Sequence, residues 1–155
     1  ATSLPRVSTT LAKQLALYVI IHSPLQMASD FIENYEKHPE AFEFIKSVPV
    51  IWDTTIVLNG EIEQFLTIAR KDRNSENWYI GGITNEKSRT LQFDLSFLDE
   101  GSYVARIYAD EDSADWESNP LDYKIFEKIV SKGESVTMKL ASGGGQAIEL
   151  EKLKD

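Results

Sequence analysis

Residues 89–95, Arg-Thr-Leu-Gln-Phe-Asp-Leu, decide the fold class, because apolar and polar side chains alternate through them without interruption. Successive side chains of a β-strand point to opposite faces of the sheet, so Leu91, Phe93 and Leu95 would share one face. Residues 103–109, Tyr-Val-Ala-Arg-Ile-Tyr-Ala, alternate in the same way. The pattern predicts two strands, each with one face turned to an apolar core.

Short strands are expected along the rest of the chain after Trp52 as well. They cover residues 54–58, 64–70, 78–83, 123–130 (with Tyr123, Ile125 and Ile129 facing inward), 136–140 and 147–150. Asn59-Gly60 is a strong hairpin-turn signal. Gly81-Gly82 indicates a bulge or close packing. About eight short strands at near-regular spacing are typical of an antiparallel β-sandwich of Greek-key type, so the expected fold class is mainly β.

The residues before Trp52 have helical patterns instead. Ser8 is the expected N-cap of a first helix, which becomes apolar all round beyond Ala16 and ends before Pro24. Residues 25–28 are too short for a helix and would form a brief buried strand. Two more helices are expected, over residues 31–37 and 39–47, with Pro39 suited to the first turn of the last one.

A helix, a short buried strand and another helix in succession are typical of the last unit of a β/α barrel. These helices also have too few apolar partners within the first 50 or so residues, which indicates the end of a larger helical layer. We therefore divide the chain into residues 1–51, a helical segment from the end of a (β/α)8 barrel, and residues 52–155, a C-terminal β-sandwich.

Composition excludes several classes of partner. The 155 residues carry a formal net charge of −9, which argues against nucleic acid and against an anionic membrane surface. The chain has no cysteine, so disulfides and cysteine-based zinc sites are excluded. It starts at Ala1 without a Met, which indicates a processed protein or a fragment.

Four side chains are candidates for contact with a carbohydrate. Asp30 follows the short predicted strand, where barrel proteins carry functional residues, although a cap of the helix starting at Phe31 is the favoured interpretation. Trp78, Tyr79 and Trp116 could stack on sugar rings, whereas most aromatic residues at strand spacing belong to a core. Trp78 and Tyr79 point to opposite faces, so one of them is expected to be exposed, and Trp116 lies in a polar loop.

No residue stands in a motif that marks a catalytic or metal-binding site. The loop from Asp110 to Asp115 is acidic, and calcium prefers oxygen ligands, but the EF-hand order is missing. A solvated loop is the favoured interpretation, so we expect no metal site and no cofactor in this chain.

Several stretches resemble glycoside hydrolase family 97. Residues 9–19, 23–28 and 33–36 resemble the closing part of its catalytic barrel, and residues 57–62, 67–71, 78–84 and 143–145 resemble its C-terminal sandwich. The resemblance covers nearly the whole chain, and it is specific as a combination.

The resemblance implies a parent protein that is an α-glucosidase or α-galactosidase, typically from Bacteroidetes and periplasmic or extracellular. It implies an N-terminal β-sandwich and a barrel as partners of this chain, an oligosaccharide as the substrate of the parent, and calcium held by carboxylates near the active site. The catalytic residues and calcium ligands would all precede Ala1, so no catalytic residue is assigned here.

Two functions are therefore weighed for the chain. The first is a non-catalytic scaffold for the catalytic barrel of an enzyme that cleaves α-glycosidic bonds. The alternative is a carbohydrate-binding β-sandwich. The helices of the isolated chain are expected to expose an apolar patch, which favours self-association or docking to the missing barrel.

Overall fold

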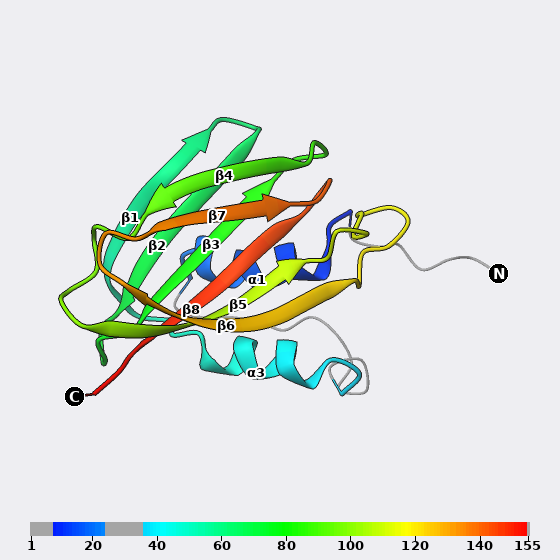
Figure 1. Ribbon diagram of the computed structural model, residues 1–155. Helices are drawn as coiled ribbons and strands as arrows, with labels where there is room; N and C mark the ends of the chain where they lie inside the picture. The colour runs from blue at the N-terminus through cyan, green and yellow to red at the C-terminus, as the bar shows by residue number, and fades with distance from the viewer. Residues whose placement is uncertain (1–7, 24–35, 155) are drawn as a thin grey trace.

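The computed structural model describes residues 8–23 and 36–154, and it confirms a mainly β fold (Figure 1). The elements are α1 (Leu11–Ile20), α3 (Pro39–Ser47), β1 (Trp52–Glu61), β2 (Phe65–Asp72), β3 (Trp78–Thr84), β4 (Arg89–Asp94), β5 (Ser102–Asp110), β6 (Tyr123–Ser131), β7 (Ser135–Leu140) and β8 (Gly145–Lys152). The strand predicted at residues 25–28 and most of the helix predicted at 31–37 lie outside the described residues.

The strands form two antiparallel sheets that pack face to face. The larger sheet has the order β1-β2-β3-β8-β5-β6, and β4 pairs with β7 in the smaller one. The last strand, β8, therefore returns to the centre of the larger sheet, between β3 and β5. This return is the connection that a Greek-key sandwich requires.

The predicted alternation decides which side chains fill the space between the sheets. Leu91, Val136, Met138 and Ile107 are buried there, together with the other inward residues of β3, β5 and β8. The inward assignments on β6 are wrong for this core. Ile129 is 58% exposed, and its neighbour Val130 is buried instead. Tyr123 and Ile125 pack on the opposite face, against the helices. Strand β6 lies at an edge of the sheet, and its residues 126–129 are all exposed, so its alternation is a poor guide.

The two helices cover the other face of the larger sheet, which produces three layers (Figure 1). Ala12, Leu15, Ala16 and Val19 form the buried face of α1, which lies over β3 and β8. The apolar partner that these helices lack within the first 50 residues is thus the outer face of the sheet. The division of the chain into two domains stays a prediction, since this contact joins the two halves.

Gly81 and Gly82 allow both layers to approach β3 closely. A Cβ atom on Gly81 would lie 2.7 Å from the carbonyl oxygen of Ala16 in α1, and one on Gly82 would lie 2.6 Å from the sulfur of Met138. Strand β3 pairs with β2 and β8 without a register shift, so of the two predicted explanations close packing is right and the bulge is wrong.

Two local predictions are also wrong. The N-cap of α1 is Thr10, whose hydroxyl accepts a hydrogen bond from the amide of Lys13, rather than Ser8. Asn59 and Gly60 lie inside β1, where Gly60 pairs with Leu66, and the chain turns over residues 62–64. Glu63 supplies the positive φ of 62° in that turn. Pairing with β2 prevails over the local turn propensity of Asn-Gly.

Candidate functional site

The contact between the helices and the sheet is centred on an aromatic cluster. The ring of Phe44, from α3, lies with its centroid 4.8 Å from that of Tyr108 and 6.4 Å from that of Tyr79. Trp52 packs edge-on against Tyr79 at 5.6 Å. All four side chains are buried, so this cluster joins α3 to β1, β3 and β5 through apolar area.

Two polar contacts tie the C-terminal ends of the helices to the sheet. The Tyr79 hydroxyl donates a hydrogen bond of 3.2 Å to the carbonyl oxygen of Ser47, the last residue of α3. The Arg70 guanidinium donates bonds of 2.8 Å to the carbonyl oxygen of Ile20 and 3.1 Å to the hydroxyl of Thr55. Arg70 is buried, and this burial lowers its pKa. A cation near a helix C-terminus is favourable, because unpaired carbonyl groups gather there.

The N-terminus of α1 is held by loops from the far end of the chain. The amide of Thr10 donates to the carbonyl oxygen of Gly143 at 3.1 Å, and the amide of Leu11 donates to that of Pro120 at 2.8 Å. Two of the amide groups that a helix start leaves unpaired are thereby satisfied.

Asp110 organises the same junction. Its Oδ2 accepts hydrogen bonds from the amides of Ala141 (2.9 Å) and Gly145 (3.0 Å). Asp110 is only 5% exposed, so the predicted solvated loop over residues 110–115 is wrong at this residue. Burial raises the pKa of Asp110, while hydrogen bonds and the positive charge of Lys13 oppose this rise. Burial lowers the pKa of Lys13, whose ammonium donates to the carbonyl oxygen of Thr84 at 2.7 Å.

The candidate carbohydrate contacts do not gather at one place. Asp30 lies outside the described residues. Trp78 and Tyr79 are both buried, at 4% and 3% exposure, so the expectation that one is exposed was wrong. Trp78 belongs to the core between the sheets and Tyr79 to the contact with the helices. Trp116 is half-buried in the loop after β5, with its Cβ and Cγ against Gly143.

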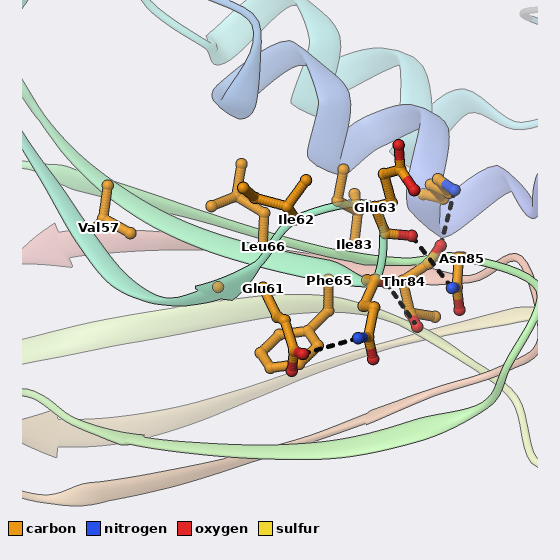
Figure 2. Close-up of a pocket in the computed structure, with 12 residues that line it drawn as sticks. Val57, Glu61, Ile62, Glu63, Phe65, Leu66, Ile83, Thr84 and Asn85 are labelled. Atoms are coloured by element: carbon orange, nitrogen blue, oxygen red, sulfur yellow. Dashed lines mark hydrogen bonds between the residues drawn. The ribbon is translucent and has the colours of Figure 1, made fainter.

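Two open pockets are present at the surface of the described chain. One, of about 550 Å³, lies between the turn joining β1 and β2 and the start of α1, and its floor is apolar (Figure 2). The other, of about 490 Å³, is polar and is lined by residues 88–90, 110–112, 114 and 139–142. Neither pocket holds a predicted aromatic contact.

Residues 8–23 and 36–154 offer neither a cluster of metal ligands nor a membrane-spanning helix. No three His, Asp or Glu side chains gather there in a group that could hold a metal ion. The described helices are also too short to cross a bilayer, which takes about 20 residues.

Comparison with protein families identifies the sandwich. Residues 51–151 match the family model described as "Glycosyl-hydrolase 97 C-terminal, oligomerisation". The chain belongs to glycoside hydrolase family 97. The resemblance seen in the sequence is thereby confirmed for the sandwich portion, and the relatives described below extend it over nearly the whole chain.

Two family 97 relatives indicate how much of a complete protein this chain represents. A retaining α-galactosidase of Bacteroides thetaiotaomicron is 37% identical over 147 residues, which cover 95% of this chain and 22% of the relative. A probable retaining α-galactosidase of Streptomyces bingchenggensis is 25% identical and is matched over 20% of its length. The chain thus spans about a fifth of the curated relatives it matches.

Solved structures support the arrangement of helices and sheets. Complexes of a family 97 enzyme from Pseudoalteromonas sp. with panose and with acarbose superpose on 96% of this chain, at a TM-score of 0.94 and 44% identity. The chain again covers only 23% of that protein. A β-arabinopyranosidase with 22% identity shares the fold, at a TM-score of 0.75.

The residues that hold the layers together were mostly not found from the sequence. Arg70 stands in a strand pattern and was given no role. Phe44 was not singled out within its helix, and Tyr108 was placed only on one face of its strand. A charged residue inside an otherwise apolar strand is the one signal that could have found Arg70, because such a residue is buried only with partners. Chemically, the assembled site offers apolar contact and fixed hydrogen bonds, which suit docking.

Proposed function

We propose that this chain is a non-catalytic C-terminal portion of a family 97 glycoside hydrolase that cleaves α-glycosidic bonds, and that it acts as a scaffold for the catalytic barrel. The relatives' names and the sugars in the solved complexes support the class of reaction. They concern those proteins, so the choice between glucosides and galactosides is left open for the parent of this chain.

One observation carries the proposal: the apolar outer face of the sandwich is occupied by helices that precede it in the chain. Phe44, Leu15 and Val19 are fully buried against this face. Burying each such side chain stabilises the contact by about 1.5–3 kcal/mol. If α1 and α3 are the last helices of a barrel, the sandwich is fixed to that barrel by the same apolar contact that folds this chain.

Calorimetry of the parent enzyme tests the scaffold. Phe44→Ala removes the centre of the aromatic cluster and should cost about 3–5 kcal/mol. The expected result is that one cooperative transition separates into two, for the barrel and the sandwich. Leu98→Ala, in the core between the sheets, is the matched control and should lower the transition without separating it. An unsplit transition in Phe44→Ala would contradict the scaffold.

The non-catalytic part of the proposal has its own test. The purified 155-residue chain is incubated with p-nitrophenyl α-glucoside and α-galactoside, and release of nitrophenol is followed. No turnover above the blank is expected, because the catalytic residues implied by the resemblance precede Ala1. Turnover that copurifies with the chain would refute this assignment.

Carbohydrate binding is the second candidate, favoured by the polar pocket beside the loop that carries Trp116. Ser88, Arg89 and Lys139 bring hydrogen-bonding groups to this pocket. Isothermal titration with maltooligosaccharides and galactosides should give heat if the candidate is right, and Trp116→Ala should reduce it. Absence of heat, with tryptophan fluorescence unchanged by sugar, would remove the candidate.

The remaining expectations from the resemblance belong to the same proposal. The parent would hold its calcium outside the described residues, and it would be periplasmic or extracellular. Chelation with EDTA should therefore lower the activity of the parent and leave the unfolding temperature of the 155-residue chain unchanged. The isolated chain would self-associate through the helix side, and sedimentation at several concentrations measures this. A monomer at every concentration would contradict it.

A further inference from the structure

An apolar groove remains open on the helix side of the larger sheet. Its volume is about 550 Å³, and Lys13 of α1 lines one side of it. In Figure 2, Val57, Ile62, Leu66 and Ile83 point to the side of the sheet on which α1 lies. Val57 is 62% and Ile62 is 89% exposed, so the apolar outer face of the sheet continues past α1 without a cover.

The flank of α1 beside this groove is apolar as well. Leu17 stands four residues after Lys13 on the same flank of the helix, and Ile21 follows as the C-cap, one residue past the helix end. Leu17 is half-buried and Ile21 is 54% exposed. The sheet gives the groove an apolar wall, and Lys13 lines it from α1. A second helix beside α1 would pack its apolar face on such a surface.

The order of the helices across the sheet identifies which element is missing. His38, just before α3, packs on Tyr123 of β6, and Phe44 packs on Tyr108 of β5, so α3 covers that edge. Helix α1 covers β8 and β3 in the middle. The groove follows over β2 and β1. From α3 back to α1, the position of the helix on the sheet therefore shifts from β6 towards β1.

Consecutive helices of a β/α barrel are neighbours in its outer ring. We propose that the groove beside Val57 and Ile62 receives the barrel helix that precedes α1 in the parent protein. This inference rests on the proposed scaffold function and adds a third helix to the docking surface. Family 97 relatives are several times longer than the chain, so the parent has ample sequence for this helix.

The groove also defines the chemistry of its occupant. An amphipathic helix would place apolar residues at positions i, i+3, i+4 and i+7 on Val57, Leu66 and Ile83. Glu63 is exposed at the rim on the side of α1, whereas Glu61 points to the other side and accepts a hydrogen bond from Gln64. Lys13 is already engaged with Thr84. A Lys or Arg of the incoming helix would therefore lie opposite the Glu63 carboxylate (Figure 2).

Photo-crosslinking in the parent protein tests the occupant. Ile62 is replaced by p-benzoylphenylalanine, and the crosslinked peptides are identified by mass spectrometry. The expected product is an intramolecular crosslink to a segment N-terminal to Ala1 with the apolar and basic pattern described above. The same replacement at Phe126, an exposed aromatic on β6, is the control and should not reach that segment. A crosslink between two copies, a crosslink elsewhere or none at all would overturn the inference.

A charge introduced into the groove provides an independent readout. Ile62→Glu should lower the unfolding temperature of the parent by several degrees, whereas in the 155-residue chain it should leave that temperature unchanged, because the side chain is exposed there. Phe126→Glu is the matched control and should behave alike in both proteins. Equal effects of Ile62→Glu in both would refute the occupant. That result would not contradict the proposed scaffold function if Phe44→Ala still separated the unfolding transition of the parent into two.

Discussion

The hydroxyl of Tyr79, in the middle of the larger sheet, donates a hydrogen bond of 3.2 Å to the carbonyl oxygen of Ser47 at the end of α3. This single bond links a central strand of the sandwich to a helix that precedes it, and burial raises the pKa of the Tyr79 phenol, so the donor stays protonated at neutral pH. A directional hydrogen bond thus adds to the apolar contact that holds α3 on the sheet.

Tyr79→Phe removes this bond and keeps the ring. We expect a loss of about 1 kcal/mol in the free energy of unfolding, which corresponds to a fall of about 2–4 °C in the unfolding temperature measured by circular dichroism. Tyr103→Phe is the matched control, because the buried hydroxyl of Tyr103 has no hydrogen-bond partner within the described residues. That variant should be neutral or more stable. Equal losses in both variants would contradict the role of the bond.

The adjacent glycines of β3 should differ in their tolerance of a methyl group. In Gly81→Ala the new Cβ meets the backbone of α1, which cannot move without lifting the helix. In Gly82→Ala it meets the flexible end of Met138. We expect Gly81→Ala to cost about 3 kcal/mol, the upper end for overpacking, and Gly82→Ala about 1 kcal/mol. Urea unfolding measures both, and a reversed order would disprove the close approach of α1.

Asp110→Ala should uncouple the loops at the start of α1. The change leaves the amides of Ala141 and Gly145 without their acceptor, at a cost of about 1–3 kcal/mol for each buried group. Asp110→Asn retains an acceptor oxygen and should cost less. Hydrogen exchange at residues 11–14 should become faster in Asp110→Ala. Unchanged exchange there would show that the junction does not hold the helix.

Glu149 should make the stability of the chain depend on pH. Burial raises the pKa of Glu149, and the nearby Glu151 adds to the rise. A raised folded-state pKa means that the protonated form is favoured in the folded chain. This contribution is full below the ordinary value of 4.5 and is lost as the pH rises through the folded-state pKa.

Glu149→Gln should therefore be more stable than the natural chain at pH 7, and the difference should shrink towards pH 4. Urea unfolding at both values measures it. Glu127→Gln is the control, since Glu127 is an exposed partner of Arg106 at 2.9 Å, and exposed ion pairs contribute about 0–1 kcal/mol. If Glu149→Gln does not raise the free energy of unfolding at pH 7, the charge of the half-buried Glu149 does not destabilise the folded chain.

The strand pattern predicted much of the sandwich, because alternation depends on a two-layer core that the sequence itself encodes. Leu91, Met138 and Ile107 were placed correctly for that reason. Alternation does not reveal what covers the outer face. Trp78 and Tyr79 were expected to differ in exposure, whereas the helix layer buries the second one as fully as the smaller sheet buries the first.

Local signals were less reliable where tertiary contacts compete with them. Asn59-Gly60 has the composition of a turn, but the chain pairs through it, since Gly60 fits against Leu66. Asp110 begins an acidic stretch and was therefore placed at the surface. Its carboxylate accepts hydrogen bonds from Ala141 and Gly145, which lie 31 and 35 residues further along the chain, so no short sequence window contains its partners.

The central position of β8 has a consequence for how the protein is made. Residues 145–152 leave the ribosome after every other described strand, yet they lie between β3 and β5 and beneath α1. While translation proceeds, α1 therefore has no complete sheet to pack against, and its apolar face stays exposed to solvent. Folding of the whole unit is postponed until synthesis of this last strand, and a premature stop before Gly145 would leave the earlier strands without their centre.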